Sequence, residues 1–356
     1  MKLWERNVRI VVPYTPGEQP QDGQMIKLNT NENPYPPAPG VEKALRGLSA
    51  EQMRLYPDPK AKILVEALAE YYGLKEEQVF VGVGSDDVLA MCFLTFFNSE
   101  KPILFPDITY SFYDVWAELF RIPYRRPLLN DAFQIQAEDY FGENGGIIFP
   151  NPNAPTGEVL SLEKIEEILK HNRDVVVIVD EAYVDFGAKS ALPLTEKYDN
   201  LLVVQTFSKS RSMAGMRIGF AMGNPDLIRC LNEVKYSFNS YTMDRTALIS
   251  GAEAIRDREY FEKTTAKIVE TREWAKEQLR RLGFTFGDSQ ANFLFITHRD
   301  CEASGLYEAL RKAHIYVRYF SSPRIDNYLR VTIGTREEME TLIAFLGNYL
   351  SEKKKG

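Results

Sequence analysis

Two apolar runs of the chain end in side chains that can carry out chemistry. The first run, VVVIVDEAYVDF (175–186), brings Asp180 and Tyr183 to its end, and the second run, VVQTFSKS (203–210), ends beside Lys209. Both runs are rich in β-branched residues, which is typical of buried strands. In open α/β sheets, ligands bind beyond the carboxyl ends of the strands. We therefore expect Asp180 and Lys209 to meet at one binding site.

A second group of residues could bind an anion. Ser85 and Asp86 lie between an expected strand and an expected helix, where free backbone N–H groups and the helix dipole favour negative charge. The same two residues could instead be simple helix caps. Ser208 and Lys209 form a second polar cluster with Arg217, eight residues further on. The planar guanidinium of an arginine suits a phosphate group because it can donate two hydrogen bonds at once.

One ligand could use all of these groups if it carried a phosphate, an aromatic ring and a carbonyl. A lysine can form a Schiff base with a carbonyl, and a buried carboxylate can keep a ring nitrogen protonated. Pyridoxal phosphate is bound by this division of labour. The hypothesis assigns Asp180 to the ring nitrogen and Lys209 to the aldehyde of that cofactor.

The elements that must position these residues alternate along the chain. Short apolar strands alternate with helices up to about residue 223, the next fifty residues are helical, and the last part alternates again. Continuous apolar strands between helices favour a mostly parallel sheet covered on both faces. We expect an α/β fold with a large domain at 32–256. Residues 1–31 and 257–356 would form a smaller α+β domain, with a long helix near 257–283 as the connector.

Composition argues against several other functions. The 356 residues carry a formal net charge of −7, which disfavours nucleic-acid binding. The sequence contains no run of 18 or more apolar residues, so we expect no segment that spans a membrane. The N-terminus lacks the apolar core of a signal peptide. Cys92, Cys230 and Cys301 are widely spaced and odd in number, which indicates free thiols and a cytoplasmic location. Three histidines without HExxH or CxxC argue against a metal site.

Other known motifs fit the chain poorly. No GxxxxGK[ST] accompanies the acidic strand end at Asp180, so a P-loop ATPase is not expected. DFG and HRD occur in the wrong order for a protein kinase. GVGSDD resembles a dinucleotide-binding turn, but Asp87 stands where the third glycine is needed.

Nine motifs in order resemble those of fold-type I, class I/II-like pyridoxal-phosphate aminotransferases. Within that group the chain is most similar to the histidinol-phosphate aminotransferases, and the resemblance covers nearly the whole sequence. The motifs are LNTNENP (28–34), YPDP (56–59), VGVGSDD (81–87), PDITYSFY (106–113), NPNAPTG (151–157), VDEAYVDF (179–186), TFSKSRSMAGMRIGF (206–220), QANFLF (290–295) and YLRVTIGT (328–335).

The resemblance implies a role for each matching residue around the cofactor. Lys209 would be the Schiff-base lysine that also moves the proton between substrate Cα and cofactor C4′. Asp180 would pair with the pyridinium nitrogen, Tyr183 would donate to the ring 3′ oxygen, and Tyr110 would stack on the ring. The phosphate would be bound by Ser85, Asp86, Ser208 and Arg217, and by Tyr56 from the other subunit of a homodimer.

One position departs from the family pattern. The asparagine that usually contacts the 3′ oxygen immediately precedes the proline of PTG, and Ala154 stands there in this chain. Either the backbone shifts so that Asn153 serves, or Tyr183 alone carries the oxygen. We expect the first alternative, in which Asn153 contacts the 3′ oxygen.

The resemblance also implies a substrate site. Arg330 would clamp the α-carboxylate of a small-molecule substrate, and Arg318 and Tyr14 are candidates for a distal phosphate. Asn33 and Asn292 would line the same side of the site.

The implied activity is transamination between histidinol phosphate and 2-oxoglutarate, which gives imidazole acetol phosphate and glutamate in histidine biosynthesis. Two other enzymes share nearly the same motifs, a threonine-phosphate decarboxylase and an aromatic amino acid aminotransferase. A non-enzymatic regulator would carry a DNA-binding helix-turn-helix ahead of this domain, and none is expected before residue 28.

Overall fold

The structure is a computed structural model that describes residues 2–15, 17–20 and 25–353. Its largest sheet has the strand order β2-β8-β7-β6-β5-β3-β4. The strands from β7 to β4 are parallel, whereas β8 is antiparallel to both of its neighbours. The expected mostly parallel sheet is therefore confirmed, with β8 as its exception. The strands are β2 (Val79–Val83), β3 (Ile103–Leu104), β4 (Tyr124–Arg125), β5 (Ile147–Pro150), β6 (Val177–Asp180), β7 (Leu201–Thr206) and β8 (Ile218–Gly223).

Helices cover both faces of this sheet. Successive side chains of a strand point to opposite faces, so Val177 and Val179 enter one apolar core and Ile178 enters the other. The first core is shared by α1 (Pro39–Arg46), α2 (Lys62–Tyr72), α5 (Leu162–His171) and α7 (Arg245–Arg256). The second is shared by α3 (Gly84–Phe96), α4 (Phe112–Phe120) and α6 (Pro225–Phe238). This two-sided burial explains why the strands read as continuous apolar runs.

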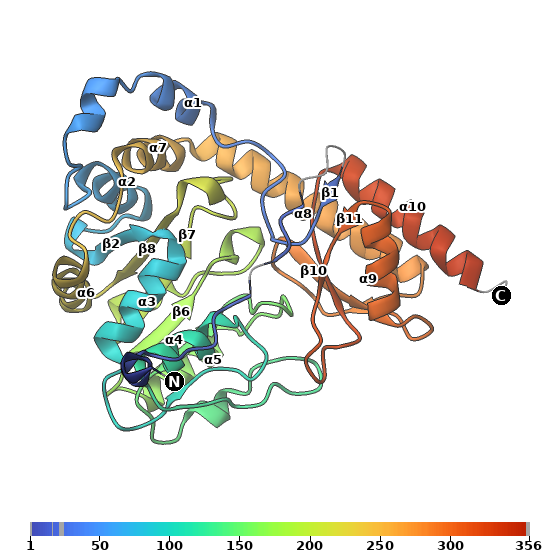
Figure 1. Cartoon of the computed structure of the whole chain (residues 1–356), viewed down its shortest axis with the longest axis horizontal. Coiled ribbons are helices and arrows are strands. Elements are labelled where there is room, and N and C mark those ends of the chain that lie inside the picture. The colour runs from blue at the N-terminus through green and yellow to red at the C-terminus, as the bar shows by residue number, and fades with distance from the viewer. Residues whose placement is uncertain (1, 16, 21–24, 354–356) are drawn as a thin grey trace.

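The C-terminal part is built on a second sheet, with the antiparallel order β12-β13-β10-β9. Three helices share its apolar core. Figure 1 shows α8, the long helix expected from the sequence, running from α7 toward this sheet. The elements are α8 (Arg258–Arg281), β9 (Thr285–Phe286), β10 (Phe293–Thr297), α9 (Ala303–Lys312), β12 (Arg318–Tyr319), β13 (Leu329–Thr332) and α10 (Arg336–Lys353).

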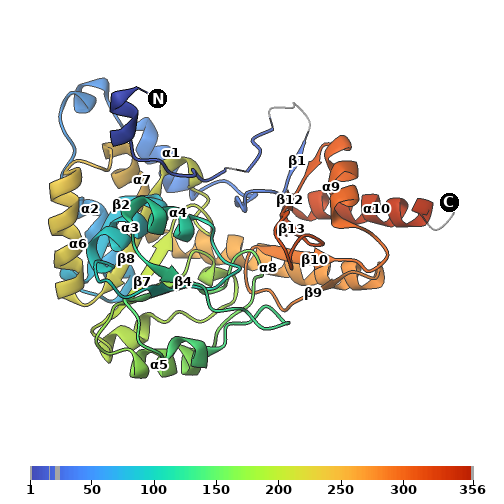
Figure 2. The same ribbon diagram turned by 60° about the horizontal axis from the view of Figure 1, so that its bottom comes forward.

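The N-terminal segment joins the two sheets. β1 (Ile26–Lys27) pairs in parallel with β11 (Ile315–Tyr316) beside the second sheet, and the chain then crosses toward the first sheet, as Figure 2 shows. We call residues 28–35 the strap. The expected domain limits stay a prediction, and residues 1, 16, 21–24 and 354–356 lie outside the described residues.

Short 3-10 helices complete the described elements. They are η1 (Leu3–Asn7), η2 (Ala50–Arg54), η3 (Glu76–Gln78), η4 (Ala137–Tyr140), η5 (Val184–Phe186), η6 (Leu192–Glu196) and η7 (Ala214–Met216). Within the described part of the chain, no helix combines the length and the apolar character that crossing a membrane would require.

Candidate active site

The carboxyl ends of the central strands open into one cavity. Asp180 is the last residue of β6, Lys209 follows β7 by three residues, and Ser85 lies in the first turn of α3 directly after β2. The sheet therefore brings together groups that are far apart in the sequence, as the strand ends predicted. The residues that line the cavity are Ser85, Asp86, Tyr110, Pro150, Ala154, Asp180, Ala182, Tyr183, Thr206, Ser208, Lys209 and Arg217.

Asp180 is a buried carboxylate with two hydrogen bonds. The Tyr113 hydroxyl donates to Asp180 Oδ2 at 2.8 Å, and the Ala182 N–H donates to Oδ1 at 3.2 Å. Burial nevertheless raises the pKa of Asp180 to about 6, because these two donors offset only part of the desolvation. A protonated ring nitrogen would supply the positive partner that this carboxylate lacks. The acidic end of the cavity thus fits a pyridinium.

The opposite end of the cavity suits an anion. Arg217 reaches from the start of β8, with its guanidinium 3.0 Å from Asp86 Oδ2 and 3.4 Å from Ser208 Oγ. The first backbone N–H groups of α3 have no partner within the helix, so they are available to a phosphate. The Asp86 carboxylate itself accepts from Arg217 and from Tyr110 at 2.8 Å. It therefore positions these two side chains, and only the backbone of Asp86 is suited to contact an anion.

The backbone at Arg217 and at Gly84 adopts left-handed conformations that place the Arg217 guanidinium. Arg217 has a φ of 50°, in the left-handed region that non-glycine residues seldom adopt. Gly84 has a φ of 84°, and a Cβ at Gly84 would collide with the Arg217 guanidinium. Both conformations bring the guanidinium against the start of α3. Strain of this kind persists where the surrounding structure holds a site in place.

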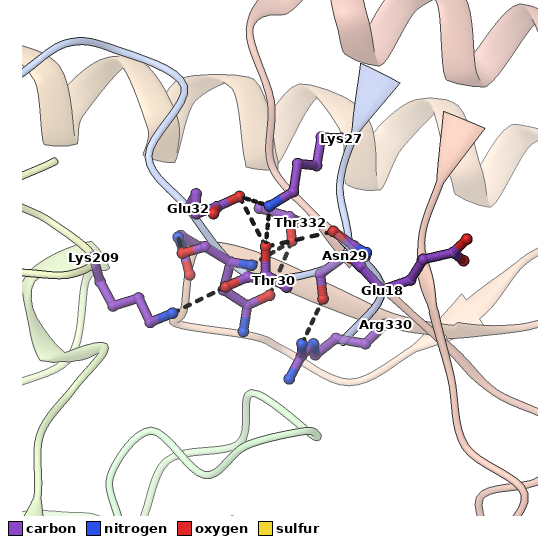
Figure 3. A network of polar contacts seen from close by, with 10 residues as sticks. Glu18, Lys27, Asn29, Thr30, Glu32, Lys209, Arg330 and Thr332 are labelled. Carbon is purple, nitrogen blue, oxygen red and sulfur yellow. Dashed lines mark hydrogen bonds and ion pairs between the residues drawn. The ribbon is translucent and has the colours of Figure 1, made fainter. Parts of the chain in front are cut away.

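Lys209 lies within reach of the strap. Its Nζ donates to the Thr30 carbonyl oxygen at 3.0 Å and lies 5.7 Å from the centre of the Tyr183 ring. In Figure 3, Lys209 and Arg330 approach the strap from different sides, and the Asn29 carbonyl accepts from Arg330 at 2.8 Å. One short backbone segment therefore separates the expected cofactor lysine from the expected substrate arginine.

The structure does not bring the Asn153 side chain into the cavity. Its amide donates to the Ile108 carbonyl and to Thr156 Oγ1, both at 3.0 Å, and its oxygen accepts from Thr109 Oγ1 at 3.1 Å. Ala154 lines the cavity in its place. The expectation that Asn153 serves the 3′ oxygen is therefore corrected: its polar atoms are taken by the turn that holds it, which leaves Tyr183.

Two arginines meet on the side expected to hold the substrate. Arg318 in β12 is the direct cross-strand partner of Arg330 in β13. Burial lowers the pKa of Arg330, and its Nε is buried without a hydrogen-bond partner. Among the described residues, neither guanidinium pairs with a carboxylate, and both lie near the Phe320 ring. Two cations without a counter-ion indicate an anion site.

The side chains of the other expected substrate residues differ in how many of their polar atoms already have hydrogen-bond partners. Tyr14 stacks on Phe112, with 4.2 Å between ring centres. Asn292 donates to the Asn31 carbonyl, and its side-chain oxygen is buried without a partner. Asn33 is engaged at both ends of its amide, because it donates to the Ser210 carbonyl and accepts from a strap N–H. Asn33 thus ties the strap to the loop of Lys209.

Tyr56 lies outside the cavity. Its side chain is 78% exposed and stacks on Tyr241, with 4.6 Å between ring centres. Tyr241 contacts Tyr56, and the Tyr236 hydroxyl donates to the Pro59 carbonyl nearby. Several apolar side chains of η2, the loop that follows it, the end of α6 and the segment after α6 are exposed. They are Met53, Leu55, Tyr236, Phe238 and Tyr241.

The sequence did not point to three residues of the site. Tyr113 contacts Asp180, Asn31 contacts Tyr183, and Thr332 contacts Asn31. Only Tyr113 had a usable signal, because it follows Tyr110 by three residues and so could share a helical face with it. The contacts of Asn31 join residues 152 and 301 positions apart, which no local pattern reveals.

Comparison with known proteins agrees with this geometry. The family model "Aminotransferase class I and II" matches residues 23–346. A crystal structure of histidinol-phosphate aminotransferase from Sinorhizobium meliloti in complex with pyridoxal-5'-phosphate superposes with a TM-score of 0.82. It covers 92% of this chain and 91% of that chain at 21% identity, so the likeness shows the fold alone. The fold and the site define a pyridoxal-phosphate-dependent aminotransferase of fold type I.

Two curated relatives are much more similar in sequence. Histidinol-phosphate aminotransferase of Lactococcus lactis subsp. cremoris (strain MG1363) is 52% identical over 352 residues, 99% of each chain. Histidinol-phosphate aminotransferase of Clostridium botulinum (strain Langeland / NCTC 10281 / Type F) is 51% identical over 342 residues, 96% of this chain and 97% of the other. The chain belongs to the histidinol-phosphate aminotransferase family within the class I and II aminotransferases.

Proposed function

We propose that the enzyme transfers an amino group between histidinol phosphate and 2-oxoglutarate, giving imidazole acetol phosphate and glutamate in histidine biosynthesis. The observation that carries the proposal is the pairing of Arg318 with Arg330, whose charge interacts with Tyr183 and Tyr110 of the cavity lining. Glutamate offers an α-carboxylate where histidinol phosphate offers a CH2 group carrying a phosphate. A pair of arginines can bind either anion, because a guanidinium presents a planar fork to carboxylate and phosphate alike.

The residues of the cavity would hold pyridoxal phosphate in one orientation. Asp180 would pair with the ring nitrogen, Tyr183 would donate to the 3′ oxygen, and Tyr110 would cover the ring. Arg217, Ser208 and the start of α3, which line the same cavity, would bind the cofactor's phosphate. When bound, the cofactor supplies an electron sink for the substrate.

Lys209 moves the proton of the reaction. Lys209 lines the cavity from the loop after β7, where its Nζ would accept the proton from substrate Cα and return it at C4′. Asp180 would stay ionised beside a protonated ring nitrogen. Arg330 holds the substrate anion, and Arg318 adds the charge that a phosphate requires. The two substrates bind in turn, so the reaction proceeds as two half-reactions.

The enzyme would act as a homodimer, which the exposed apolar patch around Tyr56 supports. In this arrangement Tyr56 reaches the cofactor phosphate of the partner subunit. The large part at 32–256 and the smaller part at 1–31 and 257–356 would be its two domains. The free cysteines are compatible with a cytoplasmic location.

A spectrophotometric half-reaction tests the proposed activity. The visible band of the bound cofactor should be lost on mixing with glutamate and, separately, with histidinol phosphate. Release of CO2 from threonine phosphate would instead identify a decarboxylase. Loss of the band with aromatic amino acids but with no phosphorylated donor would identify an aromatic aminotransferase.

A further inference from the structure

Asn31 is a strap residue whose polar atoms are all engaged. Its side chain is 1% exposed, and its φ of 57° lies in the left-handed region that asparagine tolerates. The backbone carbonyl accepts from Asn292 Nδ2, and the backbone N–H donates to Thr332 Oγ1, both at 3.0 Å. The side-chain amide lies between Thr332 and Tyr183. A residue held at so many points has a fixed orientation.

The hydrogen bonds of Thr332 fix which way the Asn31 amide points. A backbone N–H can only donate, so Thr332 Oγ1 accepts from it and has its own proton left to donate. That proton goes to Asn31 Oδ1 at 2.9 Å. The Asn31 Nδ2 group therefore faces Tyr183 and lies 3.0 Å from its hydroxyl oxygen. The flipped amide would leave the Thr332 proton without this acceptor.

This orientation decides the direction of the Tyr183 hydroxyl. An amide N–H group donates, so the Tyr183 oxygen accepts and its proton is free for another acceptor. Tyr183 lines the cavity, and the Phe293 ring packs edge-on against it at 5.0 Å. With Asn153 turned away and Ala154 in the lining, the hydroxyl of Tyr183 is the side-chain donor left for the cofactor's 3′ oxygen.

We propose that Asn31 is a positioning residue that fixes the Tyr183 hydroxyl as a donor to the 3′ oxygen of the cofactor. This compensates for the alanine at position 154. The inference rests on the cofactor role proposed above for Tyr183. The charged and titratable groups around Tyr183 and the cavity that it lines are Lys209, Arg330, Tyr110, Tyr113, Asp86, Asp180 and Arg217. The Asn31 substitution changes none of these side chains.

The test is a pH titration of the visible absorption band of the holoenzyme without substrate. A hydrogen-bond donor to the 3′ oxygen stabilises the anionic form of that oxygen. Weakening the donor should therefore move the midpoint of the pH titration to a higher pH. Asn31→Gly removes the amide and keeps the left-handed backbone available. The free energy of one hydrogen bond corresponds to an upward shift of the midpoint by about 0.5 to 1 pH unit. Thr332→Val, which removes only the hydroxyl that orients the amide, should shift the midpoint less in the same direction.

Two controls separate this role from a general loosening of the strap. Asn29→Gly changes the same residue type two positions away, where the side chain is equally buried but donates to the Glu18 carbonyl. It should leave the midpoint within about 0.2 unit. In a Tyr183→Phe background, Asn31→Gly should cause no further shift, because its effect passes through the hydroxyl.

The outcomes are distinct for the two proposals. An unchanged midpoint in Asn31→Gly, or the same shift with and without the Tyr183 hydroxyl, would overturn the role of Asn31 alone. If Asn31→Gly fails to fold, an unchanged midpoint in Thr332→Val overturns it. A wild-type protein that acquires no visible band with pyridoxal phosphate would overturn the cofactor role of the cavity and this inference together.

Discussion

Arg318 and Arg330 face each other directly across the ladder between β12 and β13, so the two guanidinium groups project from the same face of the small sheet. Like charges at such positions destabilise a sheet, and no carboxylate among the described residues offsets them. An anion bound between the two guanidinium groups would remove this repulsion. The register between β12 and β13 therefore favours the binding of an anion by these two arginines.

The first prediction concerns stability without substrate. Arg318→Gln should unfold at an equal or higher urea concentration than the wild type in a buffer without multivalent anions, with a gain of roughly 0.2 to 1 kcal/mol. Added inorganic phosphate should stabilise the wild type more than the variant. Arg299→Gln is the matched control, because Arg299 is 89% exposed and pairs with Asp300 instead of facing another arginine. Equal stabilisation of all three proteins by phosphate would contradict the anion site.

Lys209→Ala should abolish transamination. Among the described residues, Lys209 is the lysine that lines the cavity, so no other side chain there can both bind the cofactor's carbonyl and carry the proton. Turnover should fall by several orders of magnitude, measured with saturating glutamate and 2-oxo acid. Near-normal turnover, together with borohydride labelling of a different lysine, would show that the assignment is wrong.

Asp180→Asn should separate function from stability. Burial raises the pKa of Asp180 to about 6, above its value of about 3.9 in an unfolded chain. The unfolded state thus loses this proton first, and the cofactor-free wild type should lose up to about 3 kcal/mol of stability as pH rises from 4 to 7. The asparagine variant should lack this loss while deprotonating substrate Cα far more slowly.

Urea unfolding of both cofactor-free proteins at pH 4 and pH 7 measures how their free energies of unfolding differ across this range. Glu181, whose pKa burial raises to about 7, is present in both proteins and cancels in the comparison. If the free energies of unfolding of the two proteins differ by the same amount at both pH values, Asp180 does not titrate in this range. Unchanged rates of hydrogen exchange at substrate Cα would make Asp180 a structural anchor.

The sequence predicted the parts of the site that follow from strand ends. Asp180 and Lys209 end neighbouring parallel strands, and such ends meet at one edge of the sheet by topology alone. The expectation that the Asn153 side chain faces the cavity does not agree with its hydrogen bonds. A turn decides which of two adjacent residues points into a cavity, and the sequence does not reveal this. The pairing of Arg318 with Arg330 was also out of reach, since it depends on the register between β12 and β13.

Tyr56 supplies a test of the homodimer. Tyr56→Phe and Lys209→Ala subunits, mixed and allowed to exchange, would form dimers in which one site carries both changes and the other carries neither. Activity should rise above the average of the two parent proteins, because the second site is intact. Activity that stays at this average after exchange, with mixed dimers present by mass spectrometry, would show that each site is self-contained.

The most direct measurement of the central claim compares two substrates in two arginine variants. Losing a charged contact in a desolvated site costs about 2 to 5 kcal/mol, or about thirty-fold to several thousand-fold in kcat/KM. Arg330→Ala should lose this much for both glutamate and histidinol phosphate. Arg318→Ala should lose far more for histidinol phosphate than for glutamate. Equal losses for the two substrates in Arg318→Ala would contradict a shared anion site in which Arg318 serves the phosphate.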